Sequence, residues 1–405
     1  MSFLRAARAA LASQSGLPRI LVAMVVVLAG LSLSCSNGSN VTTAVPSHNA
    51  YVTLPATGQV LLLHIDGATG AITMGAQTPQ EQDTSPTGLA LLPSKKFLYA
   101  INSNARANSI SIFNVASDGT LTNTRTAPTP AGGSSPTSAV IDPSGKYLLV
   151  TNNSCNNDIG CVSVFSIDGG SGALTPVGSP VPANEYPSEI LITASGKFVY
   201  VTNPTIGAIT AFTFSNSDGT LTQLPGSPFS SLPGGGGGAF GLAVDGSEQF
   251  LYVTNPSATN PPPYAATNGN ISGFTIGADG ALTPISGSPF TAANGSGPSA
   301  ITVDPGSTFV YATTTGSSAS IWCFSINPAD GVLAAATYSP FSLTAGGLFA
   351  LFDPSGNYFY IGSSGSNGIA GYTYKSSTGA PTAITGSPFS TGTPATPPGK
   401  MVLSE

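Results

Sequence analysis

The residues in this chain best suited to chemistry are two glutamates in one short polar segment. Glu185 and Glu189 lie four residues apart in ANEYPSEI. Two carboxylates held near each other can divide general acid and base roles, and Arg106 or Arg125 could add a positive charge. We therefore take Glu185, Glu189 and Arg106 as the candidate catalytic set. The alternative, two solvated surface carboxylates, stays open.

Four further polar residues are candidates for binding a ligand. They end strand-like segments or stand in variable loops: Asn152, Asp158, Asn203 and Asn255. Variable loops on a regular scaffold are where binding normally occurs. The alternative for the asparagines is that they cap backbone groups at the ends of strands.

Several kinds of catalytic site are excluded by the residues at hand. The chain has two histidines, His48 and His64, and a zinc site needs three or four clustered ligands. No G-x-S-x-G nucleophile turn and no phosphate-binding P-loop occurs. We expect neither a metal nor an organic cofactor.

The cysteines indicate an oxidising compartment. Cys155 and Cys161 flank the loop NNDIG, where a disulfide is plausible for an exported protein. A metal site at this spacing lacks a nearby histidine or further cysteine. Cys323 lies in IWCFSI and is expected to be a buried, small apolar side chain.

The N-terminal residues have the pattern of an export signal. An apolar run over 20–33 follows three arginines and ends at Cys35. A cysteine after a small residue at this point resembles a bacterial lipobox, which implies lipidation of Cys35; the alternative is ordinary cleavage nearby with a free thiol. We assign 1–34 to a signal peptide and 35–49 to the lipidated cysteine and a flexible tether. The expected location is the periplasm or cell surface, with the lipid as membrane anchor.

Composition restricts the partners of the remaining chain. After Cys35 it carries 8 basic and 17 acidic side chains, a net charge of −9. Nucleic-acid binding needs a basic surface, so that class of partner is excluded. We expect a monomer that meets the membrane only through its N-terminal lipid.

A unit of roughly 50 residues, returning seven times, determines the expected fold. Its clearest copy begins SPTSAVIDPSGKYLLVTNN, and the anchor Tyr-Val-Thr-Asn recurs at 200–203 and 252–255. Short strands at this period predict an all-β, seven-bladed propeller of four-stranded antiparallel blades over 50–405. The mature chain enters at a second strand, so Met401–Leu403 is expected to complete the blade begun by Tyr51. The phenylalanines of the repeated SPF motif are expected to wedge between blades.

The blade pattern separates two faces of the ring. Turns after the first and third strands are short and uniform, whereas loops after the second strand and links between blades vary. These variable segments include 152–160, 230–238 and 255–270. They define a loop-rich face, on which we expect the functional site.

The repeat resembles that of the seven-bladed lactonase-like propellers, the group that holds propeller-type 6-phosphogluconolactonase and exported YVTN-repeat proteins. The matching motifs are DPSGKYLLVTN, FTIGADGALTPISGSPF and FDPSGNYFYIG. The resemblance implies the fold of 50–405 and a lactone-hydrolysing activity. Enzymes of the group use histidine, arginine and glutamate on the loop-rich face; the corresponding stretches here read Ser135–Ser138, Ser188–Glu189 and Asn203–Pro204.

Three functions are therefore weighed. The first is an exported envelope propeller that binds a protein, glycan or small molecule through its loop-rich face. The alternatives are a hydrolase acting on a sugar lactone and a structural envelope protein. A phosphorylated substrate is disfavoured because the net charge is negative and only two arginines follow Cys35.

Overall fold

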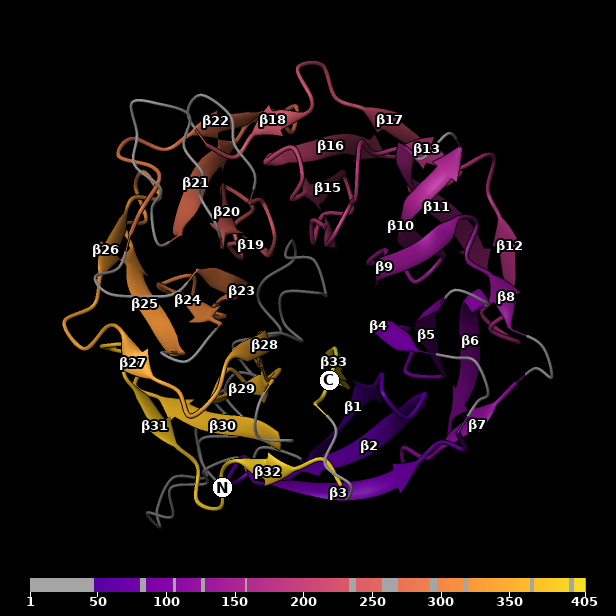
Figure 1. Cartoon of the computed structure of the whole chain (residues 1–405), viewed down its shortest axis with the longest axis horizontal. Coiled ribbons are helices and arrows are strands. Elements are labelled where there is room, and N and C mark those ends of the chain that lie inside the picture. Colours follow the sequence, from indigo (N-terminus) through magenta and orange to yellow (C-terminus); the bar gives the residue numbers. More distant parts are fainter. Residues whose placement is uncertain are drawn as a thin grey trace, which may run out of the picture. The chain divides into compact units, whose positions relative to one another are not determined.

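Seven β-sheets form a closed ring in the computed structural model (Figure 1). The structure describes residues 47–80, 85–104, 107–124, 128–156, 159–232, 238–256, 269–291, 297–315, 319–364, 368–392 and 397–404. The predicted signal peptide and Cys35 lie outside these residues. The first strand begins at His48, two residues before the predicted start of the propeller.

The first four blades comprise the following strands, each set given from the ring axis outward. Blade 1 contains β33 (Met401–Leu403), β1 (His48–Leu54), β2 (Gln59–Ile65) and β3 (Ile72–Gln77). Blade 2 contains β4 (Pro86–Leu91), β5 (Phe97–Asn104), β6 (Ala107–Val115), β7 (Leu121–Asn123) and β8 (Thr129–Pro130). Blade 3 contains β9 (Ser134–Ile141), β10 (Tyr147–Asn156), β11 (Ile159–Ile167), β12 (Leu174–Pro176) and β13 (Val181–Pro182). Blade 4 contains β14 (Ile190–Ile192), β15 (Phe198–Asn203), β16 (Ala208–Phe214), β17 (Leu221–Gln223) and β18 (Phe229–Ser230).

The last three blades follow the same plan. Blade 5 contains β19 (Leu242–Val244), β20 (Phe250–Asn255), β21 (Asn270–Ile276) and β22 (Leu282–Pro284). Blade 6 contains β23 (Pro298–Val303), β24 (Phe309–Thr314), β25 (Ser320–Ile326), β26 (Leu333–Ala335) and β27 (Phe341–Ser342). Blade 7 contains β28 (Gly347–Phe352), β29 (Tyr358–Ser363), β30 (Gly368–Tyr374), β31 (Pro381–Ala383) and β32 (Phe389–Ser390). The predicted all-β, seven-bladed propeller is confirmed.

Blade 1 is assembled from two distant parts of the chain. β33 pairs antiparallel with β1, with Val52 opposite Met401 and Ala50 opposite Leu403. Further backbone hydrogen bonds join Thr53 to Lys400 and Gly399. The predicted closing strand is confirmed, and it covers the edge that β1 would otherwise expose.

The repeated tyrosine of the second strand joins each blade to the next. In six blades its buried hydroxyl donates to the carbonyl of a glycine in the following blade, at 2.7–3.0 Å: Tyr51 to Gly119, Tyr99 to Gly172, Tyr200 to Gly280, Tyr252 to Gly331, Tyr311 to Gly379 and Tyr360 to Gly70. The accepting glycines all have positive φ, which other residues rarely adopt. Blade 3 has Leu149 at this position, and there Gly219 approaches the ring of Tyr147 instead.

The hydrophobic core of the described residues lies between the blades. Its buried side chains form seven clusters, each shared by two neighbouring blades. The phenylalanines of the SPF motif enter four of these clusters, as predicted: Phe229, Phe290, Phe341 and Phe389. Because each cluster needs both of its blades, the ring is stable only when it is closed.

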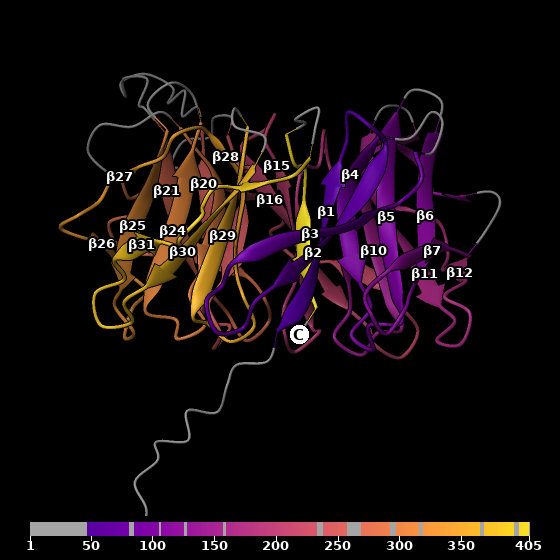
Figure 2. The same cartoon turned by 90° about the horizontal axis from the view of Figure 1, so that it is seen from below.

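The two faces of the ring differ as the blade pattern predicts. In blades 2 to 7, short turns between the first two strands lie at one end, near the C-terminus, and define the turn face (Figure 2). Connections between second and third strands lie at the other end, the loop-rich face. Within the described residues, no helix is long and apolar enough to cross a membrane.

Candidate functional site

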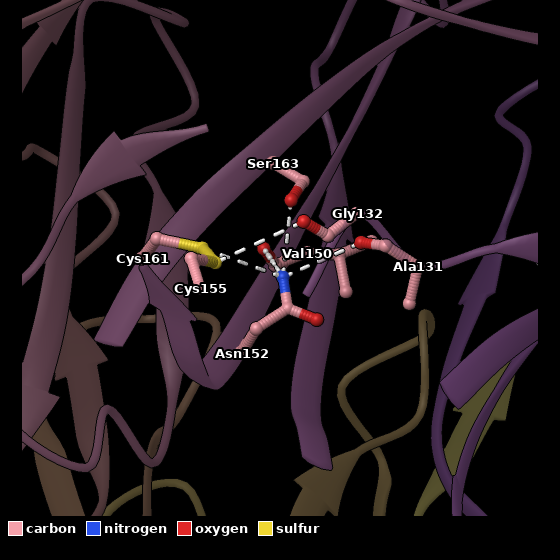
Figure 3. Close-up of a disulfide and its surroundings, with 7 residues drawn as sticks. All are labelled: Ala131, Gly132, Val150, Asn152, Cys155, Cys161 and Ser163. Atoms are coloured by element: carbon pink, nitrogen blue, oxygen red, sulfur yellow. Dashed lines mark hydrogen bonds between the residues drawn. A yellow bond between two sulfur atoms is a disulfide. The ribbon is translucent and has the colours of Figure 1, made fainter. Parts of the chain in front are cut away.

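The three asparagines predicted to bind ligand are buried, at 0% exposure each. The amide of Asn152 contacts the carbonyls of Ala131 and Val150 and, at 3.1 Å, the hydroxyl of Ser163 (Figure 3). Asn203 donates to the carbonyl of Ala183 at 2.6 Å. These contacts hold the ends of second strands, and the three side chains are covered by protein. The observed contacts are those of residues that cap groups at the ends of strands, which is the alternative to ligand binding.

Asn255 makes the same kind of contact inside blade 5. Its amide nitrogen donates to the side chains of Asn270 and Ser272, at 2.7 and 2.9 Å. Both partners lie in the neighbouring strand β21. The side chain therefore ties β20 to β21.

Cys155 and Cys161 are joined as a disulfide across the loop between β10 and β11 (Figure 3). Their Cα atoms are 6.0 Å apart, within the range for such bonds. The loop also contains Asp158, which lies outside the described residues. Cys323 is buried, and burial raises the pKa of its thiol to about 11, so it is an unreactive side chain at neutral pH.

A collar of hydroxyl groups holds the inner strands together at the loop-rich face. Each hydroxyl donates to a carbonyl in the next blade, at 2.7–3.2 Å: Thr87 to Pro136, Thr137 to Pro187, Thr202 to Phe240, Thr254 to Ser299 and Ser299 to Gly347. The collar fixes the backbone around the ring axis, so side chains projecting there start from rigid positions.

Glu189 and Lys400 occupy the same position of the repeat in blades 4 and 1. The backbone N–H of Glu189 donates to the hydroxyl of Thr202 at 3.1 Å, and the N–H of Lys400 donates to that of Thr53 at 2.8 Å. Backbone bonds from Thr202 and Thr53 return to the same two residues. The two side chains are thus held at one level of the ring.

These two side chains form an ion pair between blades that lie on opposite sides of the ring (Figure 1). Lys400 Nζ is 2.9 Å from Glu189 Oε1, and the side chains are 35% and 28% exposed. A pair that is this exposed contributes little to stability, about 0–1 kcal/mol. Its place at the mouth of the axis, and not its energy, makes it the best candidate for a functional site.

Glu185 stands apart from this pair in a tightly bent segment. Asn184 and Tyr186, on either side of it, have positive φ values of 62° and 45°. Such backbone is costly for residues other than glycine and is often found at functional sites. The amide of Asn203 holds the segment by donating to the carbonyl of Glu185 at 3.1 Å. The side chain of Glu185 is exposed, and the structure does not bring it to Lys400.

Large apolar side chains are exposed around the same face. Of the six in the described chain, five belong to its loops and strand starts: Ile159, Tyr186, Ile206, Phe240 and Leu348. Tyr186 is 59% and Phe240 is 44% exposed. Tyr186 precedes Glu189 by three residues, and the carbonyl of Phe240 accepts from Thr202, the partner of Glu189. Two open aromatic side chains therefore belong to the segments that adjoin Glu189 and Thr202.

The sequence predicted Glu189 but missed Lys400, Tyr186 and Phe240. Lys400 is 211 residues from Glu189 and comes near it only through closure of the ring. Tyr186 and Phe240 resemble core residues by type, and nothing local indicates that they are open. Arg106 lies outside the described residues, and within those residues no cluster of three metal-binding side chains occurs.

Comparisons with known proteins agree on the family. The family model described as "Lactonase, 7-bladed beta-propeller" matches residues 46–186 and 266–396, about two thirds of the chain. A 6-phosphogluconolactonase of Formosa agariphila is 34% identical over 85 residues, which is 21% of this chain and 24% of that protein. The match thus spans about a quarter of the relative.

Solved structures show the same fold. A protein of Bacteroides uniformis, described as a candidate 6-phosphogluconolactonase, matches with a TM-score of 0.73 and 18% identity, over 88% of this chain and 99% of that one. The periplasmic gluconolactonase of Pseudomonas aeruginosa matches with a TM-score of 0.70 and 16% identity, over 89% and 99%. At these identities the likeness concerns the fold alone. From the family match, the chain belongs to the seven-bladed β-propeller lactonase family.

Proposed function

We propose that this protein hydrolyses a sugar lactone at the loop-rich mouth of its ring axis. The observation that carries the proposal is the Glu189–Lys400 ion pair, which places opposite charges at one level of the ring. The family match favours this alternative over the binding-protein function weighed first and over a purely structural role. Those two functions have no comparison in their favour.

The two charges fit the two needs of lactone hydrolysis. Water must lose a proton as its oxygen adds to the carbonyl carbon, and the Glu189 carboxylate is the group suited to accept it. Negative charge then develops on the carbonyl oxygen, which the Lys400 ammonium can stabilise. The ring C–O bond breaks, its oxygen takes a proton, and a hydroxy acid leaves. The carboxylate of that product is repelled by Glu189, which favours release.

The exposed aromatic rings provide a place for the substrate's carbon skeleton. Tyr186 and Phe240 are exposed in segments that adjoin Glu189 and its partner Thr202, and apolar faces of sugar rings pack well on open aromatic side chains. A phosphate would bring negative charge beside the Glu189 carboxylate, on a chain whose net charge is −6. We therefore expect an unphosphorylated lactone to be the better substrate.

The test is hydrolysis of glucono-1,5-lactone and its 6-phosphate by the full chain, corrected for spontaneous opening of the ring. Glu189→Gln should lower kcat/KM by about 10²–10⁴-fold, the usual effect of removing a general base. Lys400→Met should lower it by about 10²–10³-fold, as for loss of one transition-state donor. Turnover that stays at the spontaneous rate in the wild type would reject the proposal.

Two further variants sharpen that test. Lys375→Met, which removes a lysine from the turn face, should leave turnover unchanged and controls for net charge. Glu185→Gln separates the two members of the predicted acidic pair. If Glu185→Gln loses turnover while Glu189→Gln keeps it, Glu185 is the general base and the assignment to Glu189 is wrong.

We also propose that the protein is exported and held at the envelope by a lipid on Cys35. The support is the sequence alone: three early arginines, the apolar run over 20–33 and the cysteine that follows. Cys35→Ala should release the protein into the soluble fraction, which fractionation and immunoblotting measure. Unchanged membrane association of the variant would contradict lipid anchoring.

A further inference from the structure

The short turn between first and second strands fills the turn face in the ordinary blades. In blade 3 the carboxylate of Asp142 accepts the backbone N–H groups of Ser144, Lys146 and Tyr147, at 3.0, 2.8 and 2.6 Å. Aspartates at the same place cap this turn in blades 5, 6 and 7: Asp245, Asp304 and Asp353. These turns close the end of each blade with packed, hydrogen-bonded backbone.

Blade 1 cannot contain such a turn. Its first strand β33 and second strand β1 are neighbours in the sheet but belong to distant parts of the chain. A hollow of about 840 Å³ lies where the turn would be, between blade 1, blade 2 and the blade 7 turn at Pro354 and Ser355. We call this hollow the seam pocket. Its size is within the range of small-molecule sites.

The seam pocket gathers groups that are rare elsewhere in the chain. Its lining includes both histidines of the protein, His48 and His64, together with Lys95 and Lys96 and several serines. None of its described lining residues is acidic. Three carboxylates adjoin lining residues in the sequence: Asp118, Asp353 and Glu405. Asp118 accepts hydrogen bonds from the N–H and hydroxyl of Thr120, and Asp353 accepts the N–H of Tyr358, so both are engaged by their own turns. A concave, cationic site therefore exists on a protein whose net charge is −6.

The backbone of Lys95 adds an independent observation. It has φ of 59°, whereas the equivalent turn position is glycine in blades 3, 4 and 7. Blades 5 and 6 also carry a non-glycine residue there, and each reaches back to the preceding blade. Glu248 accepts from the N–H of Ser195, and the hydroxyl of Ser307 accepts from the N–H of Gly246 at 2.8 Å.

Lys95 has the same geometry but a different neighbour. The blade before it is blade 1, which lacks the turn that Glu248 and Ser307 contact, so the side chain of Lys95 lines the seam pocket instead. Among the described residues, the long cationic side chain of Lys95 thus stands at a strained backbone position without the kind of protein partner found in blades 5 and 6. Strain that a protein contact does not explain is consistent with a role in binding.

We propose that the seam pocket binds a small hydroxylated anion, a sugar acid or sugar phosphate. The lysine ammonium groups suit the carboxylate or phosphate. Serine hydroxyls and imidazoles can both donate to and accept from sugar hydroxyls. The Nδ1 atom of His64 lies 2.8 Å from Asn49 Oδ1, and this contact fixes the orientation of the imidazole ring. The site is separate from the Glu189–Lys400 pair, which lies on the opposite face.

The test is calorimetric titration of the full chain with gluconate, glucose 6-phosphate and uncharged glucose at low ionic strength. The two anions distinguish a carboxylate from a phosphate site, and glucose tests the need for charge. Lys95→Met/Lys96→Met should weaken binding of the preferred anion by about tenfold or more, because two charge-assisted contacts are lost. Glucose should bind far more weakly than either anion.

The repeat offers a matched control. Lys146 and Lys197 stand at the position of Lys96 in the turns of blades 3 and 4, so Lys146→Met/Lys197→Met removes the same charge away from the seam pocket. This control should stay within about twofold of wild type, as expected for distant, screened charges. Equal loss in the control, or equal binding of glucose, would overturn the proposal. Unchanged anion binding by Lys95→Met/Lys96→Met would also overturn it. Loss of anion binding only in Lys400→Met would do the same, because it would assign the anion to the loop-rich face. Absence of measurable binding for all three probes would also reject it.

Discussion

Blade 1 and blade 5 have the same four-stranded plan and the same inter-blade tyrosine, but they are completed differently. In blade 5 the turn capped by Asp245 links β19 directly to β20. In blade 1, β33 and β1 meet from distant parts of the chain, and a hollow replaces the turn. The comparison indicates that the repeat supplies the scaffold, whereas distinctive chemistry collects where the repeat is interrupted.

The Glu189–Lys400 pair supports the same view at the other face. Equivalent hydrogen bonds to threonine hydroxyls are made by Ser138 in blade 3 and Gly241 in blade 5. Among blades 1, 3, 4 and 5, the residue whose N–H donates to the threonine hydroxyl is charged only in blades 1 and 4. Lys400 directly precedes the closing strand, so ring closure creates one half of the ion pair and also leaves the seam pocket.

Removal of the closing strand should have the largest effect on this comparison. Deleting residues 396–405 removes β33, its ladder to β1 and the buried side chain of Met401. The loss combines a core side chain, worth about 2–5 kcal/mol, with an exposed strand edge. We expect unfolding or aggregation, measured by thermal denaturation and light scattering. Undiminished thermal stability would show that blade 1 does not depend on its closing strand.

Two methionines give point variants that sharpen this test. Met401 is 6% exposed in the cluster between blades 7 and 1, and Met74 is 50% exposed on β3 of the same blade. Met401→Ala should cost about 2–4 kcal/mol, whereas Met74→Ala should cost less than about 0.5 kcal/mol. Equal costs would mean that β33 packs loosely.

Alkaline pH should lower the free energy of unfolding through every tyrosine that bridges two blades. Burial raises the pKa of Tyr51 to about 12 and raises that of Tyr99, Tyr200, Tyr252, Tyr311 and Tyr360 further. Below the unfolded value near pH 10, both states are protonated and the contribution is complete. Above it the unfolded chain releases protons that the folded chain keeps, so stability falls by about 1.4 kcal/mol per pH unit for each tyrosine.

Urea unfolding at pH 9, 10 and 11 measures this dependence. For Tyr51, at the seam, the decline should stop near pH 12, where the folded state also ionises. Replacing one of these tyrosines with phenylalanine should reduce the slope above pH 10 by about 1.4 kcal/mol per unit. A slope that is the same in the variants would contradict burial of the hydroxyls.

The fold could be predicted because its determinants are local and repeated. The tyrosine of Tyr-Val-Thr-Asn makes the inter-blade bond, its threonine bonds to the inner strand in blades 4 and 5, and its asparagine ties strand ends together. The copies vary in detail, but each repeats part of this structural information, and the seven together specify the ring. The buried asparagines were ambiguous from sequence, because a strand-end amide can cap backbone or meet a ligand.

The two sites could be predicted only in part. Glu189 could be predicted because it is one of two glutamates in a short polar segment. Its partner Lys400 could not, because only closure of the ring brings the two residues together. The seam pocket combines a strand start at His48, a strand end at His64 and a turn of the next blade at Lys95. No local pattern connects these three segments, and the hollow depends on a turn that is missing from a single blade.

A single tyrosine hydroxyl should have a moderate effect in both kinds of blade. Tyr252→Phe in an ordinary blade leaves the carbonyl of Gly331 unpaired, and Tyr51→Phe at the seam does the same for Gly119. Each should cost about 1–2 kcal/mol in denaturant unfolding. Tyr186→Phe, on an exposed ring, should cost less than about 0.5 kcal/mol. A much smaller cost at Tyr51 than at Tyr252 would show that the seam is more compliant than the other interfaces.

Relief of backbone strain should have the smallest effect and separates the seam from ordinary blades most directly. Lys95→Gly removes a strained residue with φ of 59°, and stability should rise by up to about 1 kcal/mol. Ser307→Gly removes similar strain in blade 6 but also loses the hydrogen bond to the N–H of Gly246, so the gain should be cancelled. Denaturant midpoints measure both variants. If Lys95→Gly is stabilised while its anion binding weakens, the strained lysine is retained for the ligand. If it is destabilised like a variant that loses a protein contact, Lys95 supports the seam itself, and the pocket is a by-product of ring closure.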